Sequence, residues 1–98
     1  MPHVHDFSGI TRISRNHRHG FSDRTSTDMM PMPNGRHRHR YNTRTQMVRN
    51  HRHRLQDVTG PNINIGRGRH IHRANGMSTR DMYHRHRYRF TTGRNIKV

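Results

Sequence analysis

The sequence predicts an all-β protein made of three tandem repeats, and three observations lead to that prediction. All twelve histidines fall in six H-x-H pairs, and every second pair recurs after 34, 34, 33 and 33 residues, which marks an internal repeat. Informative positions lie two residues apart, and side chains two apart share one face of a β-strand. We expect a single domain, 1–98, with 33- to 34-residue repeats at about 3–36, 37–69 and 70–98.

Two further kinds of position keep the same register as the histidine pairs. An apolar residue stands four residues after the first histidine of each pair, at Phe7, Phe21, Tyr41, Leu55, Ala74 and Tyr88. A hydroxyl residue stands eight residues after it, at Thr11, Thr25, Thr45, Thr59, Ser78 and Thr92. This shared register indicates defined geometry rather than a histidine-rich segment of low complexity.

Each repeat is expected to contain a short strand, a long strand and a short third strand. The short first strand carries a histidine pair and ends near Phe7, Tyr41 or Ala74. Asn and Gly suit tight hairpin turns, so turns are predicted at Ser8-Gly9, Asn42-Thr43 and Asn75-Gly76. The long strands that follow are 11–21, 45–55 and 78–88.

The third strand of each repeat is expected after Thr25, Thr59 or Thr92. Asn34-Gly35 and Gly66-Arg67-Gly68 then turn the chain toward the next repeat.

The composition indicates that such strands need a stabilising interaction besides the burial of apolar side chains. Only 26% of the residues are hydrophobic, Leu, Ile, Val and Phe total 14, and the formal charge is +15. Chains of this kind rarely bury enough apolar surface to offset the entropy of ordering. Disulfides are excluded because there is no cysteine, which leaves a metal, oligomerisation or a bound polyanion as stabilisers.

The histidine pairs predict metal binding, so that the fold becomes a small metal-stapled repeat domain. Two neutral imidazoles on one strand face can ligate the same iron, nickel, cobalt, zinc or copper ion. Equivalent pairs from the three repeats would form octahedral six-histidine sites, whereas the two pairs within a repeat would form three four-histidine sites. The sequence leaves both groupings open, with a slight preference for the first. The candidate ligands are His3, His5, His17, His19, His37, His39, His51, His53, His70, His72, His84 and His86.

Catalysis is not expected from these residues. Saturated histidine coordination offers no open position to a substrate, and the chain has neither cysteine nor glutamate. The aspartates near the histidines, Asp6, Asp23, Asp57 and Asp81, are expected to orient a ligand or to pair with arginine.

The positions between the histidines are rich in arginine, and of the 20 cations only Lys97 is not arginine. Guanidinium groups make bidentate contacts to phosphate. We therefore expect a face that binds nucleic acid or another polyanion without reading its sequence. The expected contact residues are Arg18, Arg38, Arg40, Arg52, Arg54, Arg73, Arg85 and Arg87.

The segments HVHDFSGIT, GRHRHRYNTRT and NHRHRLQDVTGPNINIG resemble the YmaF-like family of small bacterial His-pair repeat proteins. The resemblance covers essentially the whole chain and rests on the H-x-H pairs, the aromatic residue that follows and the Thr59-Gly60-Pro61 linker. The first and third linkers lack Gly-Pro, and the chain is more arginine-rich than is typical of the family. The resemblance implies bacterial origin and metal binding.

Three functions follow as hypotheses. The first is a structural metal-binding repeat protein that self-assembles into an oligomer or filament and whose arginine faces bind a polyanion; open-ended repeats without polar caps stack on one another. The second is a sequence-nonspecific nucleic-acid packaging protein. The third is a soluble metal store. No signal peptide or membrane-spanning segment is visible, and the expected location is the cytoplasm or the cell or spore surface.

Overall fold

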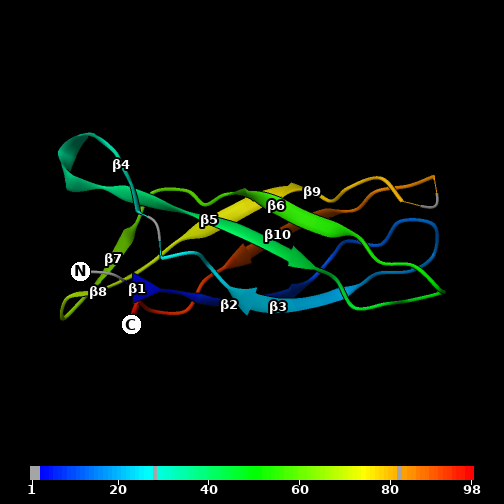
Figure 1. The fold of residues 1–98 in the computed structure, drawn as a ribbon, viewed down its shortest axis with the longest axis horizontal. Coiled ribbons are helices and arrows are strands. Elements are labelled where there is room, and N and C mark those ends of the chain that lie inside the picture. The colour runs from blue at the N-terminus through cyan, green and yellow to red at the C-terminus, as the bar shows by residue number, and fades with distance from the viewer. Residues whose placement is uncertain (1–2, 28, 82) are drawn as a thin grey trace.

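A computed structural model describes residues 3–27, 29–81 and 83–98, and in these residues it contains β-strands, one 3-10 turn at Pro33–Gly35 and no α-helix. The expected all-β class is therefore confirmed. The molecule is elongated, with principal extents of 42 × 21 × 19 Å, and its strands run mostly along the long axis (Figure 1). No helix in the described segments is long and apolar enough to cross a membrane.

Three antiparallel hairpins form the body of the molecule. The first pairs β2 (Asp6–Ile10) with β3 (Gly20–Arg24), the second pairs β5 (His37–Arg44) with β6 (Arg54–Val58), and the third pairs β9 (Arg73–Met77) with β10 (Arg87–Thr91). Strand β3 lies beside β5, β6 beside β9, and β10 beside β2. The hairpins therefore close into a three-sided prism around the long axis (Figure 1).

The hairpin turns lie in the middle of the predicted long strands 11–21, 45–55 and 78–88, so these strand boundaries from sequence were wrong. The chain reverses at Arg15 and Asn16, with φ of 52° and 66°, between the bridged residues Ser14 and His17. Arg49 and Asn50 make the equivalent turn, with φ of 52° and 67°. Positive φ at both central residues is typical of the tight turn that matches strand twist. In the third hairpin Asp81 is bridged to His84 and Tyr83 has a φ of 66°; Met82 lies outside the described residues.

The positions predicted as turns are instead inside strands, and Gly9 shows why. It lies in β2 directly opposite Phe21 of β3. A Cβ at Gly9 would come within 2.8 Å of the Phe21 ring, and one at Gly76 would come within 2.8 Å of the Tyr88 hydroxyl. Glycine is therefore present to make room for an aromatic ring, not to turn the chain.

The core lies in the middle of the prism and consists of the in-register apolar residues together with one more aromatic. Its buried members are Phe7, Phe21, Tyr41, Leu55, Ala74, Tyr88 and Phe90. Phe90 lies opposite Ala74, where the other hairpins place Asp23 and Asp57 opposite Phe7 and Tyr41. The Phe90 ring stacks on Phe7 with centroids 4.5 Å apart. It thus fills the volume that the small Ala74 leaves.

Short outer strands form at one end of the prism, as expected after Thr25, Thr59 and Thr92. Strand β4 (Met29–Pro31) pairs with β5, and β7 (Ile63–Gly66) pairs with β8 (Arg69–Ile71). The predicted turns between repeats are present, with φ of 68° at Asn34 and 56° at Arg67.

The two ends of the chain meet at the same end of the prism (Figure 1). Strand β1 (His3–Val4) pairs with β11 (Ile96–Lys97). The first and last repeats are therefore neighbours, and the repeats surround the long axis instead of stacking along it. This arrangement removes the open-ended stack on which the filament hypothesis was based.

Candidate metal centres

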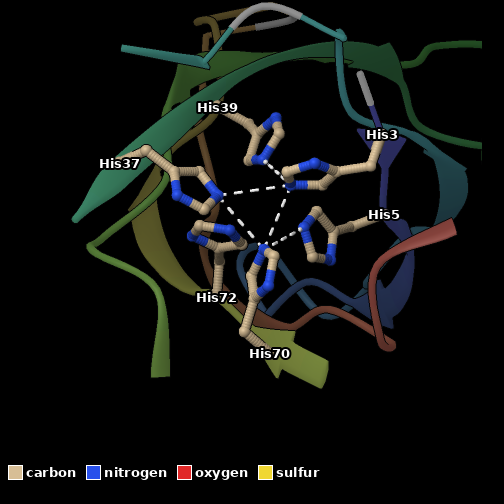
Figure 2. Close-up of side chains that lie close together, drawn as sticks. All are labelled: His3, His5, His37, His39, His70 and His72. Carbon is tan, nitrogen blue, oxygen red and sulfur yellow. Dashed lines mark hydrogen bonds between the residues drawn. The ribbon is translucent and has the colours of Figure 1, made fainter. Parts of the chain in front are cut away.

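The first histidine cluster lies at the end of the prism where the chain termini meet. It combines one H-x-H pair from each repeat: His3 and His5, His37 and His39, and His70 and His72. One ring nitrogen of each of the six lies within 4.8 Å of those of the other five. Figure 2 shows the six rings pointing inward from three sides toward a common centre.

Three Nε2 atoms in this cluster form a small triangle. The Nε2 of His3 is 3.3 Å from that of His37 and 3.1 Å from that of His70, and the His37 and His70 atoms are 3.1 Å apart (Figure 2). The Nε2 atoms of His39 and His5 lie 3.1 Å from those of His3 and His70 respectively.

The second cluster lies at the opposite end, beside the hairpin turns, and has the same plan. Ring nitrogens of His17, His19, His53, His84 and His86 lie within 4.8 Å of one another. The sixth histidine, His51, joins through its Nε2, which is 3.0 Å from the Nε2 of His17 and 3.2 Å from that of His84. The structure thus groups all twelve candidate ligands by equivalent pairs across the repeats, not by the two pairs within a repeat.

The second histidine of each pair is fixed by a hydrogen bond from its Nδ1 to a backbone carbonyl of the neighbouring hairpin. His5 bonds to Gly93, His39 to Ser26 and His72 to Gly60, at 2.9, 3.0 and 2.9 Å. At the other end the acceptors are Gln46 for His19, Thr79 for His53 and Arg12 for His86, at 2.9, 2.9 and 2.7 Å. These six bonds run around the prism and link each hairpin to the next.

The same bonds set the protonation of the other ring nitrogen. A carbonyl oxygen only accepts, so each Nδ1 must carry the proton, and in a neutral imidazole Nε2 is then a bare lone pair. Within the described residues the Nε2 atoms of His19, His53, His72 and His86 are buried and have no hydrogen-bond partner. Buried polar atoms are rarely left unsatisfied in proteins. A metal ion at the cluster centre is the partner that suits these lone pairs.

The contact between His17 and His51 supports the same conclusion. Their Nδ1 atoms lie 3.0 and 3.2 Å from the carbonyls of Arg15 and Arg49. Both Nε2 atoms are therefore unprotonated in the neutral rings, and their 3.0 Å approach lacks a proton to share. Such an approach is favourable when both lone pairs point at one cation.

The distances match six-coordinate geometry. An octahedral ion with bonds of about 2.1 Å to nitrogen places adjacent nitrogens about 3.0 Å apart and opposite nitrogens about 4.2 Å apart. Eight of the Nε2 separations are 3.0 to 3.3 Å, and the six ring nitrogens of the first cluster all lie within 4.8 Å of one another. The convergence of six nitrogens also exceeds the four that a tetrahedral zinc site uses. The residues present therefore fit an octahedral transition-metal ion at each end.

Burial favours the neutral form of eight of these imidazoles, and metal ligation requires neutral rings. Desolvation, reinforced by the neighbouring histidines, lowers the pKa of His72 to about 3 and the pKa values of His39, His70 and His86 to about 4. Desolvation likewise lowers the pKa of His5, His19, His37 and His53.

The in-register hydroxyl residues, to which the sequence assigned no role, hold the second histidine of each pair. The backbone N–H of His19 donates to Thr11 Oγ1 at 2.9 Å, and the Thr11 N–H donates back to the His19 carbonyl at 2.8 Å. The same two bonds join the pairs His5 and Thr25, His39 and Thr59, His53 and Thr45, His72 and Thr92, and His86 and Ser78. Their fixed spacing from the histidines was the signal that could have identified them.

Two aspartates are placed as the sequence suggested. Asp6 pairs with Arg24 at 2.7 Å on the exterior. The Asp81 carboxylate lies 3.2 Å from the Nδ1 of His53, where it can orient that ligand. Asp23 and Asp57 are exposed in β3 and β6, and each accepts a hydrogen bond from the backbone N–H of the next residue instead of orienting a histidine.

The expected polyanion-contact residues point outward. Arg18, Arg40, Arg52, Arg73, Arg85 and Arg87 are exposed, and Arg38 and Arg54 are half-buried. The core aromatics lie inside and are not available for base stacking, whereas Tyr83 is 82% exposed.

The fold and its two clusters define a class of protein: a three-sided β-prism with a six-histidine centre at each end. Residues 1–93 match the family model described as spore germination protein GerY/YamF, or YmaF. The chain belongs to this family, and the resemblance seen in the sequence is confirmed. Searches of curated proteins and of solved structures each found no match.

Proposed function

We propose that this chain is a structural metal-binding protein in which two octahedral ions join the three hairpins, one ion at each end of the aromatic core. The observation that carries the proposal is the convergence of buried, proton-free Nε2 atoms from all three repeats. Iron, nickel or cobalt suits an octahedral nitrogen shell better than four-coordinate zinc.

The ions would supply stability that the small core lacks. In the described part of the chain only eight hydrophobic residues are buried, seven of them in one cluster, and structural metal sites contribute folding free energy directly. Buried ligands from three hairpins favour permanently bound structural ions over metal storage, because a storage protein must release its ions. Since such saturated sites leave no position for a substrate, we propose a non-catalytic role.

Exhaustive chelation tests this proposal, with metal loss confirmed by elemental analysis. The stripped protein is expected to lose its β circular dichroism signal and its cooperative thermal transition. Full retention of the circular dichroism signal and of the thermal transition would reject a structural role for the metal ions.

As a second part of the function, we propose that the arginine exterior binds a polyanion such as nucleic acid. The support is the outward position of the eight arginines on a chain of formal charge +15. Binding is expected to be independent of base sequence and steeply salt-dependent, because neutralised phosphates release counterions. A salt titration with unrelated DNA sequences and with heparin measures this, and absence of DNA binding at low salt would exclude it. Self-assembly remains a hypothesis.

A further inference from the structure

The three outer faces of the prism differ in charge. Residues 37–59, which form the second hairpin, hold six arginines and one aspartate. The first hairpin, 3–25, holds four arginines and two aspartates, and Arg24 is already paired with Asp6. The third, 70–92, holds five arginines and one aspartate. The most positive face is therefore that of β5 and β6.

A groove runs over this same hairpin. Its main part, about 740 Å³, is lined by Arg40 and Arg54 and by the amides of Asn42 and Gln56. It shares Arg54 and Thr79 with a second hollow of about 290 Å³, to which Arg44 and Arg52 contribute. Asp57 and Asp81 are the acids that also line it. The groove on the third hairpin is smaller, about 450 Å³, and the one on the first is lined by Asp6 and Asp23.

The second hairpin also places two arginines directly opposite each other. Arg44 of β5 is the register partner of Arg54 of β6, and like charges at such positions destabilise an antiparallel pair. In the third hairpin the partners of Arg73, Arg87 and Arg89 are Thr91, Met77 and Asn75, so no such repulsion arises. A bound anion between Arg44 and Arg54 would remove the repulsion.

We propose that the β5–β6 groove is the site where this protein binds the phosphodiester backbone of nucleic acid, and that the other two faces contribute little. This inference rests on the proposed polyanion binding. Arg40 and Arg44 are four residues apart on one strand, so their Cα atoms span about 14 Å, and Arg52 and Arg54 extend the same charged track. The donors are guanidinium and amide groups, which suit phosphate oxygens.

Among the described residues that line the groove, no ring is exposed for base stacking. The rings there are those of Tyr41 and His53, which are 2% and 1% exposed. The Tyr41 hydroxyl is 2.8 Å from that of Tyr88 in the core. Contacts should therefore be to phosphates, with little preference between sequences.

The test compares two triple variants that both lower the formal charge from +15 to +12. The groove variant carries Arg40→Gln, Arg44→Gln and Arg54→Gln. The matched control carries Arg73→Gln, Arg87→Gln and Arg89→Gln on the third hairpin. Fluorescence anisotropy with a short duplex DNA measures affinity across a range of salt concentrations, and a cooperative thermal transition in circular dichroism confirms that each variant is folded.

The groove variant is expected to lose on the order of a hundredfold or more in affinity at 0.1 M salt, with a salt slope reduced by about 2.7, if each arginine neutralises one phosphate. The control is expected to lose much less. Equal losses of affinity in the two variants would refute the β5–β6 groove as the binding site, while the proposal that the protein binds polyanions would stand. No binding by the unmodified protein would instead overturn polyanion binding itself. Binding to heparin but not to DNA would refute the proposal that nucleic acid is the ligand of the groove. If a triple variant fails to fold, the doubles Arg44→Gln/Arg54→Gln and Arg87→Gln/Arg89→Gln make the same comparison.

Discussion

Replacing both histidines of one pair should cost far more stability than replacing the arginines beside them. In the variant His51→Ala/His53→Ala the second metal centre loses two of its six ligands. It also loses the Nδ1 hydrogen bonds to the Arg49 and Thr79 carbonyls, each worth about 1 kcal/mol. Both rings are buried, and truncating a buried ring to alanine costs about 3 to 5 kcal/mol.

The variant should therefore lose at least about 5 kcal/mol, which is comparable to the whole stability of a small domain. In Arg52→Ala/Arg54→Ala the side chains are exposed or half-buried, so the loss of stability should stay within about 0.5 kcal/mol while DNA affinity falls. Thermal unfolding and metal content per chain measure the difference.

If the double histidine variant does not fold, His51→Gln alone gives the same comparison, because His51 lies at the edge of its cluster and is 9% exposed. Equal losses of stability in the histidine and arginine variants, with DNA affinity unchanged in both, would refute the assignment of the two side-chain sets to interior and exterior.

Three further predictions concern the clusters and the core. The metal-loaded protein should lose stability as the pH falls below 6.5, because the unfolded chain binds protons that the buried ligand rings do not bind. Each of His39 and His86, whose pKa is lowered to about 4, removes about 2 kcal/mol by pH 5. An acid titration followed by circular dichroism that showed no transition above pH 4 would contradict this. Gly9→Ala should cost about 1 to 3 kcal/mol because its Cβ would lie 2.8 Å from the Phe21 ring, and Phe21→Leu should restore part of the loss in a double-mutant cycle. Thr45→Val should cost about 1 to 3 kcal/mol because the buried His53 N–H loses its acceptor, whereas the same change at the exposed Thr91 should leave the melting temperature nearly unchanged.

Much of the site was predictable from the spacing of the histidine pairs. The turns were misplaced because spacing alone does not show where a strand reverses. The repeat period identified which histidines are equivalent, and the period-two pattern placed histidines inside and arginines outside. The same parity also joined Thr11 through Phe21 into one strand. The turn at Arg15 and Asn16 pairs Ser14 with His17, which alone would reverse the alternation, but the pairing of β2 with β3 is shifted by one residue and restores it. Gly9 was taken for a turn residue because its contact with Phe21 is visible only in the paired hairpin.

The grouping of the histidines needed three-dimensional information for a related reason. The pairs within a repeat lie only 14 residues apart at their first histidines, yet the hairpin carries them to opposite ends of the prism. Convergence then depends on the closure of three hairpins by β1 and β11, a contact between residues at the two ends of the chain. Phe90 was likewise not assigned to the core because it breaks the register that the other hairpins share.

A titration of the metal-free protein with Co²⁺ tests the central claim most directly, because cobalt reports both stoichiometry and geometry through its visible absorption. Two six-histidine centres predict an end point at two ions per chain, with the weak bands of six-coordinate cobalt and recovery of the β circular dichroism signal. An end point at three ions with the intense bands of four-coordinate cobalt, or no saturable binding, would contradict the account.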